Sequence, residues 1–419
     1  MTVRLTTLEN GMRVLTDRMS SVETVSLGIW VAVGTRHEPA RINGVAHLLE
    51  HMAFKGTVRR SALDIASEIE AVGGHVNAYT SREHTAYYAK VLKENVGLAI
   101  DILADILQHS TFDQRELERE REVVLQELGQ ANDTPDDIIF DLFQERAYPD
   151  QPMGRPVLGR ADIIRALDRQ TIASYLHSNY AAPEMMLVAA GNLEHGEIVD
   201  LAQRAFIHLP QASAAKSEPA RYVGGDLRQA RDLEQVHILL GFPGFSFADH
   251  DYYAASVLST ALGGGMSSRL FQEIRERRGL AYSIYSFTHA YSDGGVFGVY
   301  AGTGEDEAAE VMPALCAEMR RLREGLAPGE LLRARAQLKA GLLMSLEGTA
   351  ARCEQQATHM LVFGRPLDLQ ELIQHIEEVD EAAVTRVAHR LFAAPPTLTA
   401  LGPVARIEPY ERLVDDLRA

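Results

Sequence analysis

The order of the predicted elements repeats along the chain, and this repeat limits the possible folds more than any other feature of the sequence. In each half, hydrophobic spacing predicts an apolar strand, two helices, a strand-rich stretch and two more helices. In the first half these elements are expected at residues 22–34, 43–56, 61–72, 75–92, 93–109 and 113–131. In the second half they are expected at residues 236–242, 251–262, 267–278, 281–300, 305–323 and 328–346. Because 419 residues can form two cores, the repeat predicts two domains of one plan.

A segment rich in Pro, Gly and Ala separates the halves and predicts the domain boundary. It covers residues 208–232 and contains two prolines and the pair Gly224-Gly225, which favour a loop over a helix or strand. We therefore expect domains at residues 1–208 and 233–419, joined by a linker at 209–232. The first domain is also expected to contain a hairpin at 3–14, helices at 137–147 and 161–180, and a strand at 185–191.

The composition is typical of a globular protein in a reducing compartment. A net charge of −17 argues against nucleic acid and anionic membrane surfaces as partners, because like charges repel. The longest apolar run near the start, residues 25–34, is too short to cross a bilayer, and residues 1–14 lack the apolar core of a signal peptide. Only Cys316 and Cys353 are present, so any zinc must be held by His and carboxylate. We expect a cytoplasmic protein.

The motif His-x-x-Glu-His, which spans His47 to His51, has the clearest chemistry in the sequence. We expect it on a helix that Asn43 caps and that stops near Gly56. Residues four apart lie on one face of a helix, so the two imidazoles can bind a single metal ion. Glu50 lies beside that face and can act on a water molecule without being a ligand, as in the inverted zinc-protease motif. The competing interpretation is two ordinary histidines that share this spacing by chance.

A catalytic zinc of this type needs a third protein ligand and one open position. The helix expected at residues 113–131 offers several glutamates, of which Glu116, Glu120 and Glu127 lie on one face by their spacing. The glutamates of such a helix usually face solvent, so spacing alone identifies none of them as the third ligand. In the second half the equivalent helix begins at Asp251 and has no histidine pair, so only the first half can hold a metal.

Four longer stretches carry a family resemblance. They are Gly44–Thr57, Asn77–Thr80, Glu120–Glu127 and Leu262–Phe271, the last continuing through Arg275 to residues 279–283. Through them the chain resembles the pitrilysin-type (inverzincin) zinc metallopeptidases. The resemblance is closest to the two-domain branch that includes the mitochondrial processing peptidase β subunit and its bacterial relatives. The stretches cover both halves in the order that the family shows, which makes the resemblance specific.

The resemblance implies an α+β fold of two homologous α/β-roll domains, each a mainly antiparallel sheet packed with helices. It implies one zinc ion per chain, held by His47, His51 and Glu127 of a catalytic N-terminal domain, beside a non-catalytic C-terminal domain. Glu50 is then the general base, which takes the proton of a zinc-activated water and delivers it to the leaving amine. Glu120 is expected to orient a ligand histidine, although on sequence alone it is a surface carboxylate.

The resemblance also implies how a peptide binds. In the family the substrate adds as a strand beside an edge strand near the metal, where main-chain hydrogen bonds hold it. The matching residues here are Asn77, Ala78 and Tyr79, with Phe54 as a pocket wall. A tyrosine-rich strand more often serves sheet packing alone, and this is the competing interpretation.

Arg275 and Tyr282 match the pair that the family uses to hold the substrate and the developing oxyanion. In two-chain members this pair comes from the partner of the subunit that holds the metal. Because this chain carries both sets, we expect a homodimer with a shared active-site chamber, whose negative charge favours basic peptides. The expected function is a zinc-dependent endopeptidase for extended peptides or presequence-like segments. The alternative is a non-catalytic structural or partner subunit, which in this family usually lacks some of the metal-site residues.

Overall fold

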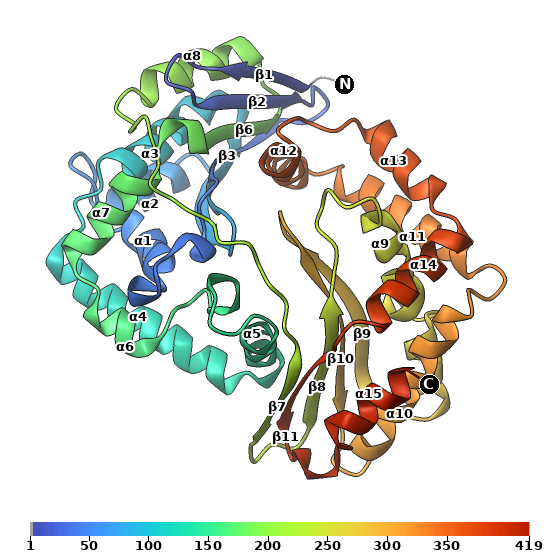
Figure 1. Cartoon of the computed structure of the whole chain (residues 1–419). Helices are drawn as coiled ribbons and strands as arrows, with labels where there is room; N and C mark the ends of the chain where they lie inside the picture. The colour runs from blue at the N-terminus through green and yellow to red at the C-terminus, as the bar shows by residue number, and fades with distance from the viewer. Residues whose placement is uncertain (1–2, 419) are drawn as a thin grey trace. The chain divides into compact units, whose positions relative to one another are not determined.

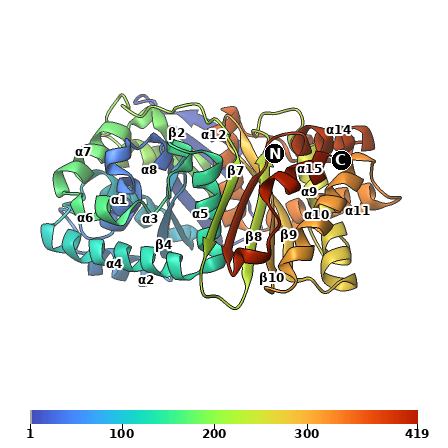
Figure 2. The same cartoon turned by 60° about the horizontal axis from the view of Figure 1, so that its bottom comes forward.

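The computed structural model describes residues 3–418 and contains two compact units, each built around one sheet (Figures 1 and 2). Unit 1 consists of the chain up to Gln130, Arg155–Glu218 and Ser345–Leu367. Unit 2 consists of Ala131–Gly154, Pro219–Met344 and the chain from Asp368 onward. Each unit takes one short piece from the opposite half of the sequence. The expected division at residues 209–232 stays a prediction.

The six-stranded sheet of unit 1 is antiparallel except for one parallel pair, β2 with β6. Its strand order is β1-β2-β6-β3-β5-β4, so β4 is an edge strand. The strands are β1 (Val3–Thr7), β2 (Arg13–Arg18), β3 (Thr24–Val31), β4 (His75–Thr80), β5 (Thr85–Leu92) and β6 (Met185–Gly191). β1 and β2 form the hairpin that the sequence predicts. β3 and β6 are buried almost throughout, as their apolar sequences require of central strands.

Most helices of unit 1 pack on one face of this sheet and enclose the main apolar core. They are α1 (Val45–Ala53), α2 (Ala62–Glu70), α3 (Val96–Gln108), α4 (Gln114–Asp133), α6 (Ala161–Ala166), α7 (Arg169–Asn179) and α8 (His195–Ala205). The long helix α4 begins after Asp113, whose side chain accepts hydrogen bonds from the N–H groups of Arg115 and Glu116 and so caps the helix. α1 and α4 carry the residues of the candidate metal centre.

Unit 2 contains a five-stranded sheet with the order β7-β11-β8-β10-β9. Its strands are β7 (Gly225–Ala230), β8 (Val236–Pro243), β9 (Ala281–Ala290), β10 (Gly295–Thr303) and β11 (Thr397–Gly402). Its helices are α5 (Pro135–Ala147), α9 (Tyr252–Gly263), a π-helix (Phe271–Arg277), α10 (Ala308–Arg323), α11 (Glu330–Ser345), α13 (Leu369–Glu378), α14 (Glu381–Phe392) and α15 (Tyr410–Arg418). Within residues 3–418, no helix combines the length and apolarity that a membrane span requires.

The two sheets share one strand order, as the repeated plan predicts. β7 pairs in parallel with β11, and the neighbours β11, β8, β10 and β9 are antiparallel, which reproduces the order β2, β6, β3, β5 and β4 of unit 1. β9 is therefore the counterpart of the edge strand β4. The predicted α+β fold of two mainly antiparallel sheets packed with helices is confirmed.

The second face of each sheet is covered by a helix from the opposite half of the sequence, which the repeat did not predict. On unit 1, α12 (Thr349–Phe363) packs against β3 and β6, where the Cys353 thiol donates to the carbonyl of Val188 at 3.1 Å. Its apolar residues join Trp30 and Met186 in a small core on the face opposite α1. On unit 2, α5 packs in the same way against β8 and β11.

The cap of the metal-motif helix α1 differs from the prediction that Asn43 caps it. Gly44 is the N-cap residue, with a left-handed φ of 93° that favours glycine. The buried carboxylate of Glu38 accepts hydrogen bonds from the N–H groups of Gly44 and Ala46, each at 2.8 Å, and the Asn43 amide also donates to it. Glu38 therefore satisfies the first turn of α1, and a carboxylate at this end also suits the helix dipole.

Other elements also differ from the expected ones. The helix expected at 161–180 breaks near Leu167, because the side chain of Asp168 accepts from the N–H of Thr171 and starts α7. Helix α8 was not predicted, and the loop-rich segment 208–232 includes the short strand β7. The helix expected at 267–278 is π-helical over Phe271–Arg277, a wider winding that apolar spacing does not distinguish from an α-helix.

The burial of Glu38 generates a prediction about stability and pH. Burial raises the pKa of Glu38 in the folded protein to about 7, above the ordinary pKa of a glutamate. At pH values below that ordinary pKa the carboxyl contributes fully to the free energy of unfolding, and this contribution is lost as the pH rises through 7. Relative to Glu38→Gln, we expect the parent to lose roughly 2 kcal/mol of unfolding free energy between pH 5 and pH 8. Denaturant unfolding of both proteins in chelator, at both pH values, measures the difference. If the difference in unfolding free energy between the two proteins is the same at both pH values, the prediction is contradicted.

Candidate metal centre

Helices α1 and α4 bring three potential metal ligands together. His47 and His51 lie one turn apart on α1, with ring centroids 4.8 Å apart. Oε2 of Glu127 on α4 lies 3.6 Å from Nε2 of His47 and 3.4 Å from Nε2 of His51. One donor atom from each of the three residues lies within 4.8 Å of the others. The ligand set that the sequence and the resemblance indicated is therefore assembled in one place.

The donor atoms suit a zinc ion. Zinc binds imidazole nitrogen and carboxylate oxygen at about 2.0–2.2 Å, so neighbouring donors of a tetrahedral site lie about 3.3–3.6 Å apart. The two measured separations from Glu127 fall in this range. Burial, with His51 beside it, lowers the pKa of His47 to about 4, so its imidazole is neutral at pH 7 and offers a lone pair. Three protein ligands leave a fourth position for a reactant, as catalytic zinc sites require.

Glu120 contacts one of the histidines. Its Oε2 lies 3.1 Å from Nδ1 of His51, so the Nδ1–H donates to the carboxylate and Nε2 is left to bind the metal. Its Oε1 lies 2.8 Å from the ammonium of Lys55, in the loop after α1. Glu120 is buried, whereas the other acidic residues of α4 are exposed or half-buried. A buried, fully engaged carboxylate at this position supports an orienting role over a surface role.

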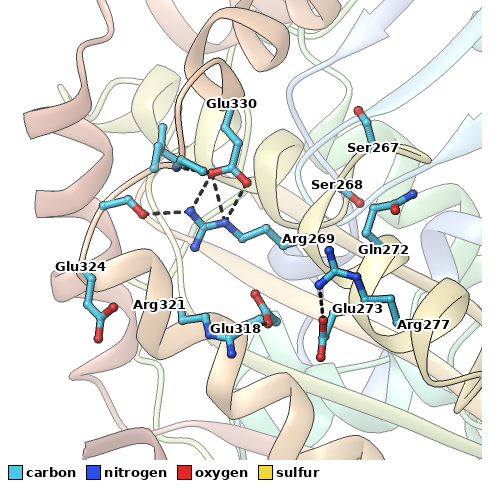
Figure 3. Close-up of a pocket in the computed structure, with 13 residues that line it drawn as sticks. Ser267, Ser268, Arg269, Gln272, Glu273, Arg277, Glu318, Arg321, Glu324 and Glu330 are labelled. Carbon is cyan, nitrogen blue, oxygen red and sulfur yellow. Dashed lines mark hydrogen bonds and ion pairs between the residues drawn. The ribbon is translucent and has the colours of Figure 1, made fainter.

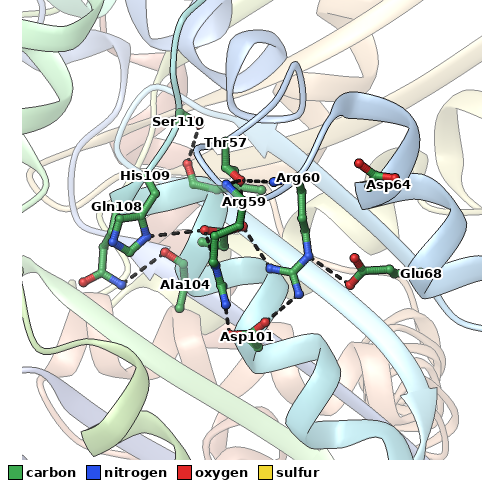
Figure 4. A network of polar contacts seen from close by, with 12 residues as sticks. Thr57, Arg59, Arg60, Asp64, Glu68, Asp101, Ala104, Gln108, His109 and Ser110 are labelled. Carbon is green, nitrogen blue, oxygen red and sulfur yellow. Dashed lines mark hydrogen bonds and ion pairs between the residues drawn. The ribbon is translucent and has the colours of Figure 1, made fainter.

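The loop that carries Lys55 is anchored by a network of charges (Figure 4). Asp105 of α3 is fully buried and accepts from Thr57 at 2.8 Å, from Arg60 at 2.9 Å and from Arg59 at 3.1 Å. Arg60 also donates to Asp101 and Glu68 in the same network. Because several hydrogen bonds converge on one buried carboxylate, they hold the loop against α3 and place Lys55 beside α4.

Glu50, the expected general base, lies on α1 beside the ligand pair. Thr80, the last residue of β4, donates its hydroxyl to Oε2 of Glu50 at 2.7 Å. Burial raises the pKa of Glu50, while this hydrogen bond and the nearby His51 oppose the shift. A carboxylate with a raised pKa and a fixed orientation can take a proton and return it near neutral pH.

The expected substrate-binding residues lie on the edge strand β4 and at the end of α1. The outer edge of β4 has no strand partner within residues 3–418, so its main chain is available to an added strand. Asn77 is exposed, and its side-chain oxygen accepts from the N–H of Ala78 at 2.8 Å. Ala78 is buried in the main core, whereas the Tyr79 side chain points to the α12 face. Phe54, at the C-cap of α1, is half-buried with its ring 6.4 Å from that of Tyr87.

Arg275 and Tyr282 belong to unit 2 and contact each other. The guanidinium of Arg275 lies 4.8 Å from the Tyr282 ring centroid and 4.6 Å from that of Phe271, in the geometry of cation–π contacts. Tyr282 is 78% exposed at the start of the edge strand β9. Arg275 lies on the π-helix, a winding that occurs often at functional sites. The pair is thus preassembled and accessible on its own unit.

A charged hollow of about 600 Å³ lies beside this π-helix (Figure 3). The Arg269 guanidinium forms a double hydrogen bond with Glu330 at the start of α11. The other two arginines that line the hollow, Arg277 and Arg321, are also paired with acids. All three arginines of the hollow are thus engaged by acids of the protein, so we assign these pairs a structural role.

Two residues of the centre were missed by the sequence reasoning. Lys55 forms an ion pair with Glu120. It follows His51 by four positions, and this spacing from the motif is the sequence signal that could have identified it. Thr80 follows the expected strand residues and faces Glu50, because alternate residues of a strand point to opposite faces. Thr80 contacts a residue of the motif, and Lys55 contacts a residue that the resemblance indicated.

Removing the charge of Glu120 should weaken metal binding. Glu120→Gln leaves His51 without a carboxylate partner, so we expect zinc affinity to fall about 10- to 100-fold. Competition with a chromogenic chelator measures the affinity. Glu122→Gln, an exposed position on the same helix, is the matched control and should bind zinc as the parent does. Equal affinities in the two variants contradict the orienting role.

Comparison with known proteins agrees with this geometry. Residues 13–161 match the family model described as insulinase (peptidase family M16), and residues 166–338 match that of the peptidase M16 inactive domain. A Rickettsia felis protein named as an uncharacterized zinc protease is 39% identical over 94% of this chain and 96% of its own. A probable mitochondrial-processing peptidase subunit beta of Arabidopsis thaliana is 37% identical over 98% of this chain and 80% of its own.

Solved structures share the fold. A protein from Pseudomonas fluorescens, described as a peptidase M16 inactive domain, superposes with a TM-score of 0.89 at 21% identity, over 98% of this chain and 100% of its own. The identity, coverage and paired domain models together lead to one conclusion: the chain belongs to the insulinase peptidase family, M16.

Proposed function

We propose that the chain is a zinc-dependent endopeptidase that cleaves extended peptides. The observation that carries the proposal is the convergence of His47, His51 and Glu127, with the Glu127 oxygen 3.4–3.6 Å from both imidazoles, as zinc ligands would be. Relatives named as zinc proteases, which match the chain over almost its whole length, support the same metal and the same reaction class. The single ligand cluster found among residues 3–418 supports one zinc ion per chain.

In this proposal, zinc when bound polarises the scissile carbonyl and makes a water molecule more acidic. Glu50 takes the proton of the attacking water and gives it to the leaving amine, while the Thr80 hydroxyl fixes the carboxylate. Glu120 keeps the His51 ring in position, and Lys55 keeps Glu120 in position. The neutral state of His47 at pH 7 keeps its lone pair free.

The proposed substrate is an extended peptide that adds as a strand beside β4. Main-chain groups of Asn77, Ala78 and Tyr79 supply the hydrogen bonds, and Phe54 forms a pocket wall. The added strand has to displace the Asn77 side chain from the N–H of Ala78, which satisfies that donor in the free protein. The net charge of −17 favours basic peptides, such as presequence-like segments.

We also propose a cytoplasmic homodimer in which Arg275 and Tyr282 of one chain complete the metal centre of the other around a shared chamber. The exposure and mutual contact of the pair support a role in binding a ligand. The alternative function, a non-catalytic structural or partner subunit, is less well supported, because all three ligands and Glu50 are present in one cluster.

Replacing the general base should abolish turnover and leave metal binding intact. We expect Glu50→Gln to retain zinc and to lose about 10²- to 10⁴-fold in kcat. Mass-spectrometric mapping of cuts in a peptide library, with and without a zinc chelator, measures activity, and metal analysis measures zinc content. Parent-like cleavage by Glu50→Gln contradicts the role of Glu50. No chelator-sensitive cut by the parent contradicts the function itself.

Mixing two inactive variants tests the shared chamber. Each Glu50→Gln chain keeps Arg275 and Tyr282, and each Arg275→Ala chain keeps a complete metal centre. If the pair acts across a homodimer, refolding the two variants together should restore roughly a quarter of the parent activity, because half of the dimers are mixed and each has one complete site. Activity no higher than that of the separate variants contradicts sharing between chains.

A further inference from the structure

The side chain of Tyr79 is held on the face of the sheet opposite the metal centre. Its hydroxyl oxygen lies 2.5 Å from Oε1 of Glu354, 3.0 Å from Nε2 of His84 and 3.3 Å from Nε1 of Trp30. Glu354 lies on α12, the helix that unit 1 receives from the second half of the sequence. A residue distant in sequence by 275 positions thus contacts the edge strand β4 directly.

The protons of this cluster can be assigned from its donors and acceptors. A carboxylate only accepts hydrogen bonds, so the Tyr79 hydroxyl donates its single proton to Glu354. The hydroxyl oxygen then accepts from the indole N–H of Trp30 and from Nε2–H of His84. Burial lowers the pKa of His84 to about 4, so this ring is neutral at pH 7. The hydroxyl thus makes hydrogen bonds to three residues, which fix the position of the Tyr79 ring.

Neighbouring residues anchor β4 on its two faces. Thr80 donates to Glu50 on the face of α1, and Tyr79 donates to Glu354 on the face of α12. The inner edge of the strand pairs with β5 from His75 to Thr80, while its outer edge has no strand partner within residues 3–418. The strand is therefore fixed in position before any partner adds to its outer edge.

We propose that Glu354 is a positioning residue for the peptide substrate. By holding Tyr79 from the α12 face, it keeps the main chain of Asn77 to Tyr79 where an added peptide strand can pair with it. The inference rests on the proposed function of β4 as the substrate-binding strand. It assigns a substrate-positioning role to the second half of the sequence through α12, separately from Arg275 and Tyr282.

The cluster contains its own optical probe. Trp30 is the single tryptophan of the chain, and its indole N–H donates to the same hydroxyl. Its fluorescence therefore reports on the surroundings of Tyr79 without labelling. A peptide that lacks tryptophan and adds to β4 should change this emission, which gives a measure of binding that does not require turnover.

The test compares variants that remove or keep the acceptor for Tyr79. Glu354→Met removes it at similar length, Glu354→Gln keeps one oxygen acceptor, and Tyr79→Phe removes the donor. Glu347→Met, an exposed position just before α12, is the control. The substrate is a quenched-fluorescence peptide without tryptophan, taken from the cuts found in the library.

With Glu354→Met and Tyr79→Phe we expect KM to rise about 5- to 30-fold, because a half-buried hydroxyl or carboxylate loses its partner. We expect kcat and zinc affinity within about twofold of the parent, since the metal ligands are untouched. Glu354→Gln should recover most of the parent KM, and the double variant should be no worse than the single ones. In a Glu50→Gln background, Trp30 emission should show the same weakening of peptide binding by Glu354→Met.

Any one of three results overturns the inference. A parent-like KM and parent-like peptide binding in Glu354→Met show that the strand needs no anchor from α12. A loss of zinc affinity and kcat in parallel, with KM unchanged, shows a general structural role instead. If the parent cuts no peptide in a chelator-sensitive way, the proposed function fails. The emission titration then still decides whether β4 binds peptide through this anchor, and absence of binding to the parent overturns the inference too.

Discussion

The carboxylate of Glu120 ties together the two helices that carry the metal ligands, and the metal centre depends on this contact. One oxygen holds the His51 ring of α1, and the other holds Lys55 in the loop that follows. Glu127, two turns further along α4, then lies within 3.6 Å of both imidazoles. The ligands are thus preorganised by protein contacts, which lowers the cost of assembling them around an ion.

The rest of unit 1 fixes this pair of helices from several sides. Glu38 caps the start of α1, and Asp105 anchors the loop at its end. Thr80 connects the edge strand to Glu50, the proposed general base. Unit 2 repeats the same strand order, but the helix equivalent to α1 has Asp251 as its N-cap residue, and this carboxylate forms ion pairs with Arg386 and Arg390. Within residues 3–418, the cluster of three potential metal ligands that was found lies in unit 1.

The sequence predicted the candidate residues that helical spacing places together and missed the contacts between distant segments. His47, Glu50 and His51 were recognised because helical spacing alone places them together, and the resemblance added Glu127, which spacing could not distinguish from its neighbours. The cap was assigned to Asn43 because such residues usually cap helices, but the tight turn at Gly44 brings Glu38 to the N–H groups instead. Glu354 gave no signal, since its partner lies 275 positions away and α12 crosses to the sheet of the other half.

The proposed function requires one zinc ion between α1 and α4. Diffraction data collected above and below the zinc absorption edge, from crystals of the zinc-loaded protein, locate the ion directly. We expect one anomalous peak per chain, about 2.0–2.2 Å from Nε2 of His47, Nε2 of His51 and a carboxylate oxygen of Glu127. A peak elsewhere in the chain, or a peak at the histidines that Glu127 does not reach, would contradict the assignment.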